Sequence, residues 1–252
     1  MGKIIAVANQ KGGVGKTTTV VSLSAYLAEQ GKRVLLVDAD PQGNATSGVG
    51  CEADKYTLYE ALLMQCEIEK TIQKTKLDRL NVCPSDIRLA GAEIELIDVE
   101  RREFRMRAAL SRVKDQYDFI VIDCPPSLSL LTINALTAAQ SVLIPIQTEY
   151  YALEGVTALM DTIRRVRHSL NTALEIEGVL LTMYDGRTNL SLQVAAQVKK
   201  HFKNQLFRTV IPRNVRLGEA PSHGEPISRY DPRSQGGLAY AALAAEVIRN
   251  NR

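Results

Sequence analysis

Cysteine and histidine are scarce in this chain of 252 residues. The four cysteines, Cys51, Cys66, Cys83 and Cys124, show no C-x-x-C spacing, and no histidine lies near them in the sequence. This pattern argues against a zinc site or a disulfide framework, because both need clustered or paired ligands. Unpaired cysteines are typical of a reducing compartment, so we expect a cytoplasmic location.

Long apolar runs and linkers are also missing. No window approaches the roughly 18 consecutive apolar residues that a membrane-spanning helix needs. No repeat, low-complexity tract or Pro/Gly/Ser-rich linker divides the chain. The length is ample for a buried core, so we predict a single domain over residues 1–252.

Charge is unevenly distributed along the chain. Residues 1–100 contain 11 Lys/Arg and 14 Asp/Glu, whereas residues 101–252 contain 20 and 14. The net charge of +3 therefore comes from the second part of the chain. A basic excess of this kind is a weak indication of a face that binds a polyanion.

A glycine-rich loop near the N-terminus separates an expected strand from an expected helix. The loop reads N-Q-K-G-G-V-G-K-T-T over residues 9–18. Strand, glycine loop and helix in this order form the layout of a phosphate-binding P-loop, in which backbone N–H groups and the helix N-terminus surround phosphate oxygens. Lys16 is placed to bind the β- and γ-phosphates, and the Thr17 hydroxyl is placed to bind Mg²⁺.

The loop departs from the usual pattern at two adjacent positions. G-x-x-x-x-G-K-[ST] requires a glycine where this chain has Gln10. The next residue is an additional lysine, Lys11. The P-loop pattern alone assigns no role to Lys11.

Apolar runs alternate with helix-like segments along most of the chain. Strands are expected over residues 3–8, 33–37, 80–84, 118–123, 141–147, 178–183 and 207–211. Helices are expected over residues 17–30, 57–64, 87–114, 129–138, 153–169, 190–202 and 237–250. Several strands are continuously apolar, which suits a parallel sheet that is covered on both faces. We predict an α/β fold with a doubly wound, mainly parallel sheet and ligands at the carboxyl ends of its strands.

Acidic residues follow two of these apolar strands. Asp123 ends the strand 118–123 and is placed to hold Mg²⁺ or its water shell. Asp38 and Asp40 follow the strand 33–37. Asp40 could orient or deprotonate the attacking water and Asp38 could support it, but the spacing alone does not rank the two.

Together these motifs resemble the deviant-Walker P-loop ATPases, and more narrowly the ParA/Soj group that partitions bacterial chromosomes and plasmids. The resemblance runs nearly from end to end and includes the segments 122–126, 211–216 and 219–224. It implies an ATPase with ATP/ADP and Mg²⁺ as cofactors, with Asp40 as the hydrolysis residue. The implied nucleotide-binding residues are Lys11, Gly12, Gly13, Val14, Gly15, Lys16, Thr17 and Thr18, with Pro212, Arg213 and Asn214 at the adenine base.

The resemblance also implies a dimer with ATP between two subunits. Lys11 would reach the partner's nucleotide, as an arginine finger does, and Gly12 would lie at the subunit junction. Arg187 and Arg216 match arginines that contact double-stranded DNA without sequence preference. A ParB-type centromere-binding protein would stimulate hydrolysis, and the protein would be associated with the nucleoid.

Three alternatives on the same fold remain open. A membrane-associated positioning ATPase like MinD would need an amphipathic terminal helix, whereas the tail 237–250 is alanine-rich and reads as a core helix. An electron-transfer ATPase like nitrogenase iron protein would need a second cysteine after Cys124, and none follows. Nothing in the sequence marks the small-molecule pocket of a ligase such as dethiobiotin synthetase.

Overall fold

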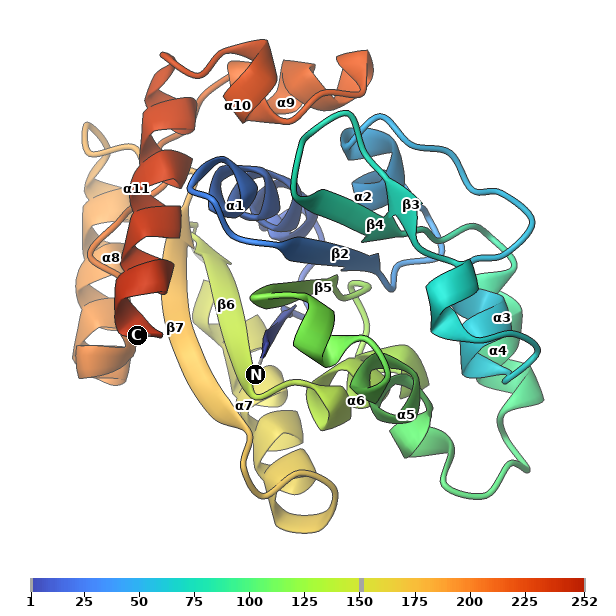
Figure 1. Ribbon diagram of the computed structural model, residues 1–252. Coiled ribbons are helices and arrows are strands. Elements are labelled where there is room, and N and C mark those ends of the chain that lie inside the picture. Colours follow the sequence, from blue (N-terminus) through green and yellow to red (C-terminus); the bar gives the residue numbers. More distant parts are fainter. Residues whose placement is uncertain (1, 150–151, 252) are drawn as a thin grey trace.

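The strands of the computed structural model, which describes residues 2–149 and 152–251, form one sheet (Figure 1). The sheet has seven strands in the order β3-β4-β2-β5-β1-β6-β7. In chain order they are β1 (Lys3–Val7), β2 (Val34–Asp38), β3 (Gln73–Lys74), β4 (Leu80–Cys83), β5 (Phe119–Asp123), β6 (Ser141–Gln147) and β7 (Glu175–Thr182). The short β3 is antiparallel to β4, and the other described pairs are parallel. The predicted mainly parallel α/β fold is confirmed.

Helices cover both faces of this sheet (Figure 1). They are α1 (Lys16–Glu29), α2 (Asn44–Gly48), α3 (Leu58–Leu62), α4 (Leu89–Glu95), α5 (Arg105–Ser111), α6 (Leu130–Ala138), α7 (Ala152–Ser169), α8 (Asn189–Phe202), α9 (Arg216–Glu219), α10 (Ile227–Tyr230) and α11 (Gln235–Asn250). Successive side chains of a strand point to opposite faces. Ile4 and Ala6 of β1 accordingly pack in the core beneath α3 to α8, whereas Ile5 and Val7 pack in the core beneath α1 and α11.

The carboxyl ends of β1, β2 and β5 meet at one edge of the sheet. Asp38 at the end of β2 is the register partner of Asp123 at the end of β5. Val7 at the end of β1 is also in register with Asp123. The glycine loop that follows β1 and both acidic strand ends are therefore brought together by sheet pairing alone.

The single helix expected over residues 87–114 is wrong. The structure has two short helices there, α4 and α5, separated by turns in which Arg101 adopts a left-handed conformation with φ of 55°. The buried side chain of Asn134 in α6 explains how the break is tolerated. Its Oδ1 accepts a hydrogen bond from Met106 N, and its Nδ2 donates to Arg102 O. Backbone groups that a continuous helix would have paired are thus satisfied by a side chain.

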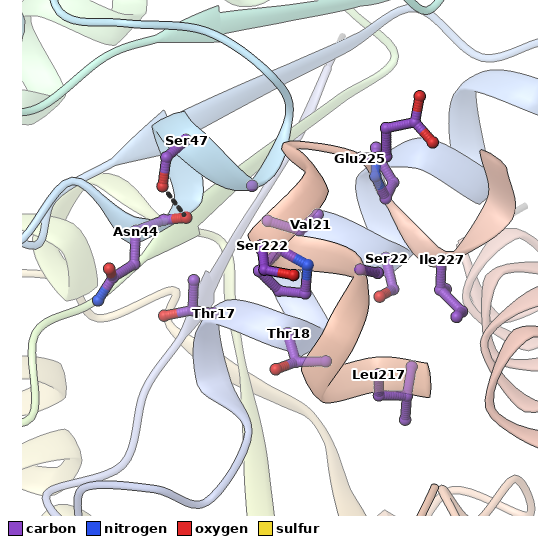
Figure 2. Close-up of a pocket in the computed structure, with 14 residues that line it drawn as sticks. Thr17, Thr18, Val21, Ser22, Asn44, Ser47, Leu217, Ser222, Glu225 and Ile227 are labelled. Atoms are coloured by element: carbon purple, nitrogen blue, oxygen red, sulfur yellow. Dashed lines mark hydrogen bonds between the residues drawn. The ribbon is translucent and has the colours of Figure 1, made fainter. Parts of the chain in front are cut away.

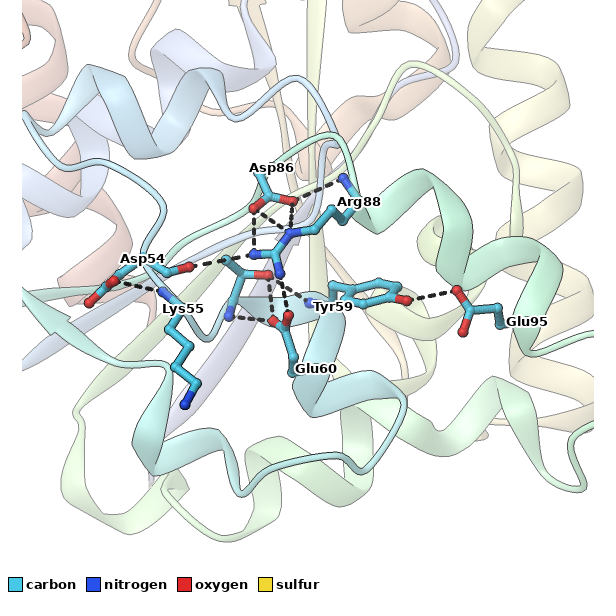
Figure 3. Close-up of polar contacts among 8 residues, drawn as sticks. Asp54, Lys55, Tyr59, Glu60, Asp86, Arg88 and Glu95 are labelled. Carbon is cyan, nitrogen blue, oxygen red and sulfur yellow. Dashed lines mark hydrogen bonds and ion pairs between the residues drawn. The ribbon is translucent and has the colours of Figure 1, made fainter.

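The turn into α4 is tied to α3 by a group of polar contacts (Figure 3). Thr57 and Glu60 form a capping box that starts α3. Arg88 lies between two carboxylates, with Nη1 2.5 Å from Glu60 Oε1 and Nη2 2.7 Å from Asp86 Oδ2. These contacts fix the chain directly after β4, next to the loop that carries Asp40.

The strand expected over residues 207–211 is also wrong. Residues 207–211 form no strand in the structure, and isolated bridges beside β7 flank them, between Val179 and Leu206 and between Tyr184 and Pro212. The backbone N–H groups of Arg208 and Thr209 donate instead to the carboxylate of Glu246 in α11. A side chain that is distant in sequence has replaced the strand partner.

Gly178 of β7 provides a test of this packing. A Cβ built on Gly178 would lie 2.4 Å from Cε2 of the buried Phe207 ring. We therefore expect Gly178→Ala to lower the free energy of unfolding by about 1–3 kcal/mol, measured by urea denaturation, because the ring has to move. Gly218→Ala is the control, since a Cβ there meets nothing within 4 Å. An unchanged unfolding midpoint for Gly178→Ala would mean that the ring does not pack on this glycine.

Candidate nucleotide-binding site

The glycine loop between β1 and α1 is held at both ends by hydrogen bonds to neighbouring strands. Asn9 Nδ2 donates to Pro145 O at 2.7 Å, and Asn9 Oδ1 accepts from Lys11 N at 3.0 Å. At the other end, Thr182 Oγ1 donates to Val14 O at 2.9 Å. Gly15 has φ of 84°, a left-handed conformation that favours glycine, and directly precedes α1. The loop is therefore pre-formed in the isolated chain.

Lys16 lies across this loop rather than in solvent. Its Nζ donates to Lys11 O at 3.0 Å, and the residue is 6% exposed. Burial lowers the pKa of Lys16, while the charges of Asp123 and Asp40 act in the opposite direction. A buried cation that faces the concave side of a glycine loop is suited to bind phosphate oxygens.

Asp123 and Thr17 form a pair beside the loop. Thr17 Oγ1 donates to Asp123 Oδ2 at 2.7 Å, whereas the buried Asp123 Oδ1 has no hydrogen-bond partner. Burial, and next the charge of Asp38, raise the pKa of Asp123 well above its ordinary value. An unpartnered carboxylate oxygen next to a hydroxyl fits Mg²⁺, which takes one or two protein ligands and completes its shell with water and phosphate. The described residues contain no cluster of three His, Cys, Asp or Glu side chains that could hold a metal alone.

Asp38 and Asp40 differ in how far their oxygens are already engaged. Asp38 is fully buried and accepts from Thr46 N at 2.8 Å, Thr46 Oγ1 at 2.7 Å and Asp40 N at 3.2 Å. Burial raises the pKa of Asp38 to about 6. Asp40 is 8% exposed, and its Oδ1 accepts from Gln42 N at 3.0 Å. Asp38 thus supports the turn into α2, which favours Asp40 as the residue that acts on water.

Two cavities adjoin the start of α1. The first, of about 340 Å³, is lined by Gly15 and Thr18 together with Pro212, Arg213 and Asn214. The structure therefore places the three residues expected at the adenine base next to the glycine loop, although they lie about 200 residues apart in the sequence.

The second cavity, of about 430 Å³, lies between α1, α2 and the segment after α9 (Figure 2). Asn44 and Ser47 of α2 line one side of it, and Leu217 and Ser222 line the other. Thr18 and Leu217 line both cavities. No site role was expected for these α2 residues, although Asn44 is the last residue of the segment 37–44 that contains Asp38 and Asp40.

Comparison with known proteins places the chain in a family. A family model described as an AAA domain matches residues 2–176. Sporulation initiation inhibitor protein Soj from Bacillus subtilis is 61% identical over 252 residues, which cover 99% of this chain and 100% of that protein. The chain belongs to the ParA/Soj family of partition ATPases. Chromosome partitioning protein ParA from Myxococcus xanthus is 52% identical, and the match covers 100% of this chain and 89% of that protein.

The solved structures agree with the fold of this ParA/Soj chain. Cobyrinic acid a,c-diamide synthase from Mycobacterium smegmatis, solved with bound ADP and magnesium, has a TM-score of 0.87 and 39% identity. The match covers 99% of this chain and 95% of that one. Family membership confirms the resemblance to the ParA/Soj group and makes the chain an ATPase of the partition type.

The Lys11 side chain of the ParA/Soj loop lies near Glu149, whereas that of Lys16 reaches across the loop. Lys11 Nζ lies 3.9 Å from Glu149 Oε2, a long ion pair between side chains that are both at least a third exposed. Such a pair contributes little to stability. A Cβ built on Gly12 meets nothing within 4 Å. The fold of the single chain therefore requires neither a fixed Lys11 nor a glycine at position 12.

Arg187 and Arg216 lie outside the loop site, each paired with an acid of its own chain. Arg187 is exposed and makes two side-chain hydrogen bonds to Asp185, at 2.9 Å and 2.8 Å. Arg216 begins α9, and its Nη1 lies 2.7 Å from Glu219 Oε2. The pairing raises the pKa of each arginine, so both carry a full positive charge at the surface.

The last helix of the ParA/Soj chain is a core helix, as its alanine-rich sequence predicted. Tyr240, Leu243 and Val247 of α11 are buried in the core that α11 shares with α1. Tyr240 also donates or accepts a hydrogen bond with Thr19 Oγ1 of α1 at 3.0 Å. Within the described residues, the structure contains no helix with the length and apolar character needed to cross a membrane.

Proposed function

We propose that this ParA/Soj chain is an ATP-controlled DNA-binding protein of a partition system. ATP and Mg²⁺ are its cofactors. Lys16 binds the β- and γ-phosphates, while Thr17 and Asp123 hold the metal ion, with Asp123 acting through a bound water. The observation that carries this assignment is the unpartnered oxygen of the buried Asp123, which lies beside the Thr17 hydroxyl at the carboxyl edge of the sheet.

Hydrolysis uses a water molecule that Asp40 orients and deprotonates. The water oxygen bonds to the γ-phosphorus while the bond to the β,γ-bridging oxygen breaks, so that ADP and phosphate are formed. Among the described residues, the Asp40 carboxylate accepts a hydrogen bond from Gln42 N, whereas the fully buried Asp38 carboxylate accepts three, which supports Asp40 in this role. The magnesium ion and Lys16 stabilise the negative charge of the leaving ADP.

Two ATP-bound chains form the dimer in which ATP lies between the subunits. Lys11 supports this arrangement because its ion pair with Glu149 is long and exposed, and the side chain can leave it at little cost. In the dimer Lys11 contacts the partner's phosphates, where a cation supplied in trans is effective only after assembly. Gly12 supports close approach of the two loops, because its open surroundings accept another chain.

The ATP-bound dimer binds double-stranded DNA without sequence preference, through Arg187 and Arg216 of both subunits. Neutralising several phosphates at once releases counterions, so affinity rises steeply when two basic surfaces are combined. A ParB-type centromere-binding protein then stimulates hydrolysis and returns the chain to the free state. ATP thus shifts the population toward the nucleoid-associated dimer.

Charge reversal at Arg216 tests the DNA surface. We expect Arg216→Glu to weaken binding of the ATP-bound dimer to DNA by about 10- to 100-fold at low salt and to reduce the salt dependence, because each subunit loses a phosphate contact. Fluorescence anisotropy with labelled duplexes measures the affinity, and light scattering confirms that the dimer persists.

The matched control for this variant is Arg33→Glu. Arg33 is also exposed and paired with an acid, Asp118, but it precedes β2 and lies at the opposite edge of the sheet. This reversal changes the net charge by the same amount and should leave DNA affinity within about threefold. Equal losses for the two variants would show that only net charge matters and would remove Arg216 from the proposed surface.

A further inference from the structure

The segment 207–214, which follows α8 and leads to the first cavity, does not pair regularly with β7. Phe207 N donates to Val179 O at 2.9 Å, and Ile211 N donates to Leu181 O at 2.9 Å. In a regular parallel ladder, donors two residues apart on one strand pair with acceptors two residues apart on the other. Thr209 N would then be the donor to Leu181 O. Two extra residues therefore bulge out between Phe207 and Ile211.

Glu246 accepts hydrogen bonds from the backbone N–H groups that have no partner on β7 because of this bulge. Its carboxylate accepts from Arg208 N at 2.8 Å, Thr209 N at 3.0 Å and Thr209 Oγ1 at 2.7 Å. Glu246 is 6% exposed and projects from the core side of α11. A buried carboxylate needs hydrogen-bond donors, and these N–H groups have no partner on β7, so the bulge and the Glu246 side chain stabilise each other.

The bulge determines which residues reach the first cavity. Beyond it, Tyr184 N donates to Ile211 O at 3.0 Å and Arg213 N donates to Tyr184 O at 3.1 Å, which directs Pro212 and Asn214 into the cavity. If Thr209 paired with Leu181 instead, the segment would move along the sheet edge by two residues, or about 7 Å. Pro212 and Asn214 would then no longer lie opposite Thr18.

We propose that Glu246 is a positioning residue for the nucleotide base, because it fixes the register of the segment 207–214 against β7. It touches no nucleotide itself. The inference rests on the proposed function, in which Pro212, Arg213 and Asn214 contact adenine. It extends the site to α11, which also contributes Tyr240 to the wall of the same cavity.

The test compares a ligand that has a base with one that does not. Binding of Mg·ATP and of Mg·tripolyphosphate to the full chain is measured by calorimetry for the wild type and for Glu246→Gln. The glutamine keeps the size of the side chain, but its amide group cannot accept from both backbone N–H groups. We expect ATP affinity to fall about tenfold and tripolyphosphate affinity to change less than twofold.

Glu177→Gln is the matched control for a purely structural role. Glu177 lies near the start of β7 and accepts hydrogen bonds from Asn251 Nδ2 at 2.5 Å and Ser141 Oγ at 2.6 Å. It therefore also ties α11's C-terminal end to the sheet, away from the glycine loop. We expect its loss to lower the unfolding temperature while the ratio of ATP to tripolyphosphate affinity stays unchanged.

Other outcomes overturn the inference. If Glu246→Gln leaves both affinities unchanged, or weakens both ligands equally, Glu246 does not position the base. If the wild type itself binds tripolyphosphate as tightly as ATP, the first cavity is not a base site, and the proposed adenine contacts fail before Glu246 is considered. If Glu246→Gln does not fold, Thr209→Val is the second variant, because it removes only the hydrogen bond from the hydroxyl group to Glu246. We expect it to lower the ratio of ATP to tripolyphosphate affinity by about threefold.

Discussion

Replacement of Lys16 by alanine is expected to abolish measurable ATP binding. Lys16 is the buried cation of the glycine loop, and its Nζ spans the loop to Lys11 O. The variant loses the charge that faces the phosphates and also the contact that closes the loop around them. Charge-assisted hydrogen bonds contribute about 1.5–3 kcal/mol each, so the loss of two of them corresponds to roughly 10²- to 10⁴-fold in affinity.

Calorimetric titration of Mg·ATP into Lys16→Ala measures this loss. Lys11→Ala is the matched control, because it removes a lysine from the same loop whose side chain lies against Glu149 rather than across the loop. We expect Lys11→Ala to bind ATP as a single chain with nearly unchanged affinity. Tight ATP binding by Lys16→Ala would rule out the assignment of this loop as the phosphate site.

Replacement of Asp40 by alanine is expected to stop the cycle after ATP has bound. Without the carboxylate that deprotonates water, the rate of hydrolysis should fall by about 10²- to 10⁴-fold. Lys16, Thr17 and Asp123 are untouched, so ATP and magnesium still bind. The variant should therefore accumulate as an ATP-bound dimer that binds DNA, which size-exclusion chromatography with light scattering can detect.

Gly12→Val is the control for this trapped dimer. A Cβ at position 12 meets nothing within 4 Å in the single chain, so we expect the fold to be unaffected. Combined with Asp40→Ala, it should give an ATP-bound monomer, because the valine occupies the space into which the partner's loop has to come. A monomer for Asp40→Ala alone in the presence of ATP would count against the sandwich dimer.

The fold could be predicted where local patterns agree with the final contacts. Continuous apolar runs such as residues 34–37 and 119–122 became strands that are buried on both faces. The predictions failed where a distant side chain replaced a backbone partner. Asn134 lies 28 residues after Met106 in the sequence, and its side chain stabilises the break in the expected helix 87–114. Glu246 lies 38 residues after Arg208, and its side chain takes the place of a strand partner for the segment 207–211. No window of local sequence contains both members of such a pair.

The position of the candidate site could be predicted because the carboxyl ends of parallel strands lie at the same edge of a sheet. Asp38 and Asp123 were expected at that edge, and sheet register puts them opposite each other. Spacing could not distinguish Asp38 from Asp40, because the difference lies in the two hydrogen bonds from Thr46, which depend on how α2 turns. The second cavity was missed for the same reason. It forms only where α2 approaches the segment after α9.

ATP is expected to convert this chain into a protein that binds DNA without sequence preference. The most direct measurement is the affinity of the full chain for two duplexes of equal length and unrelated sequence, at low salt, with and without ATP and Mg²⁺. We predict that both duplexes bind with affinities within about twofold of each other, and that omission of ATP weakens both by at least roughly tenfold. Binding that is equal with and without ATP, or that is confined to one of the duplexes, would show that ATP does not control nonspecific DNA binding in this protein.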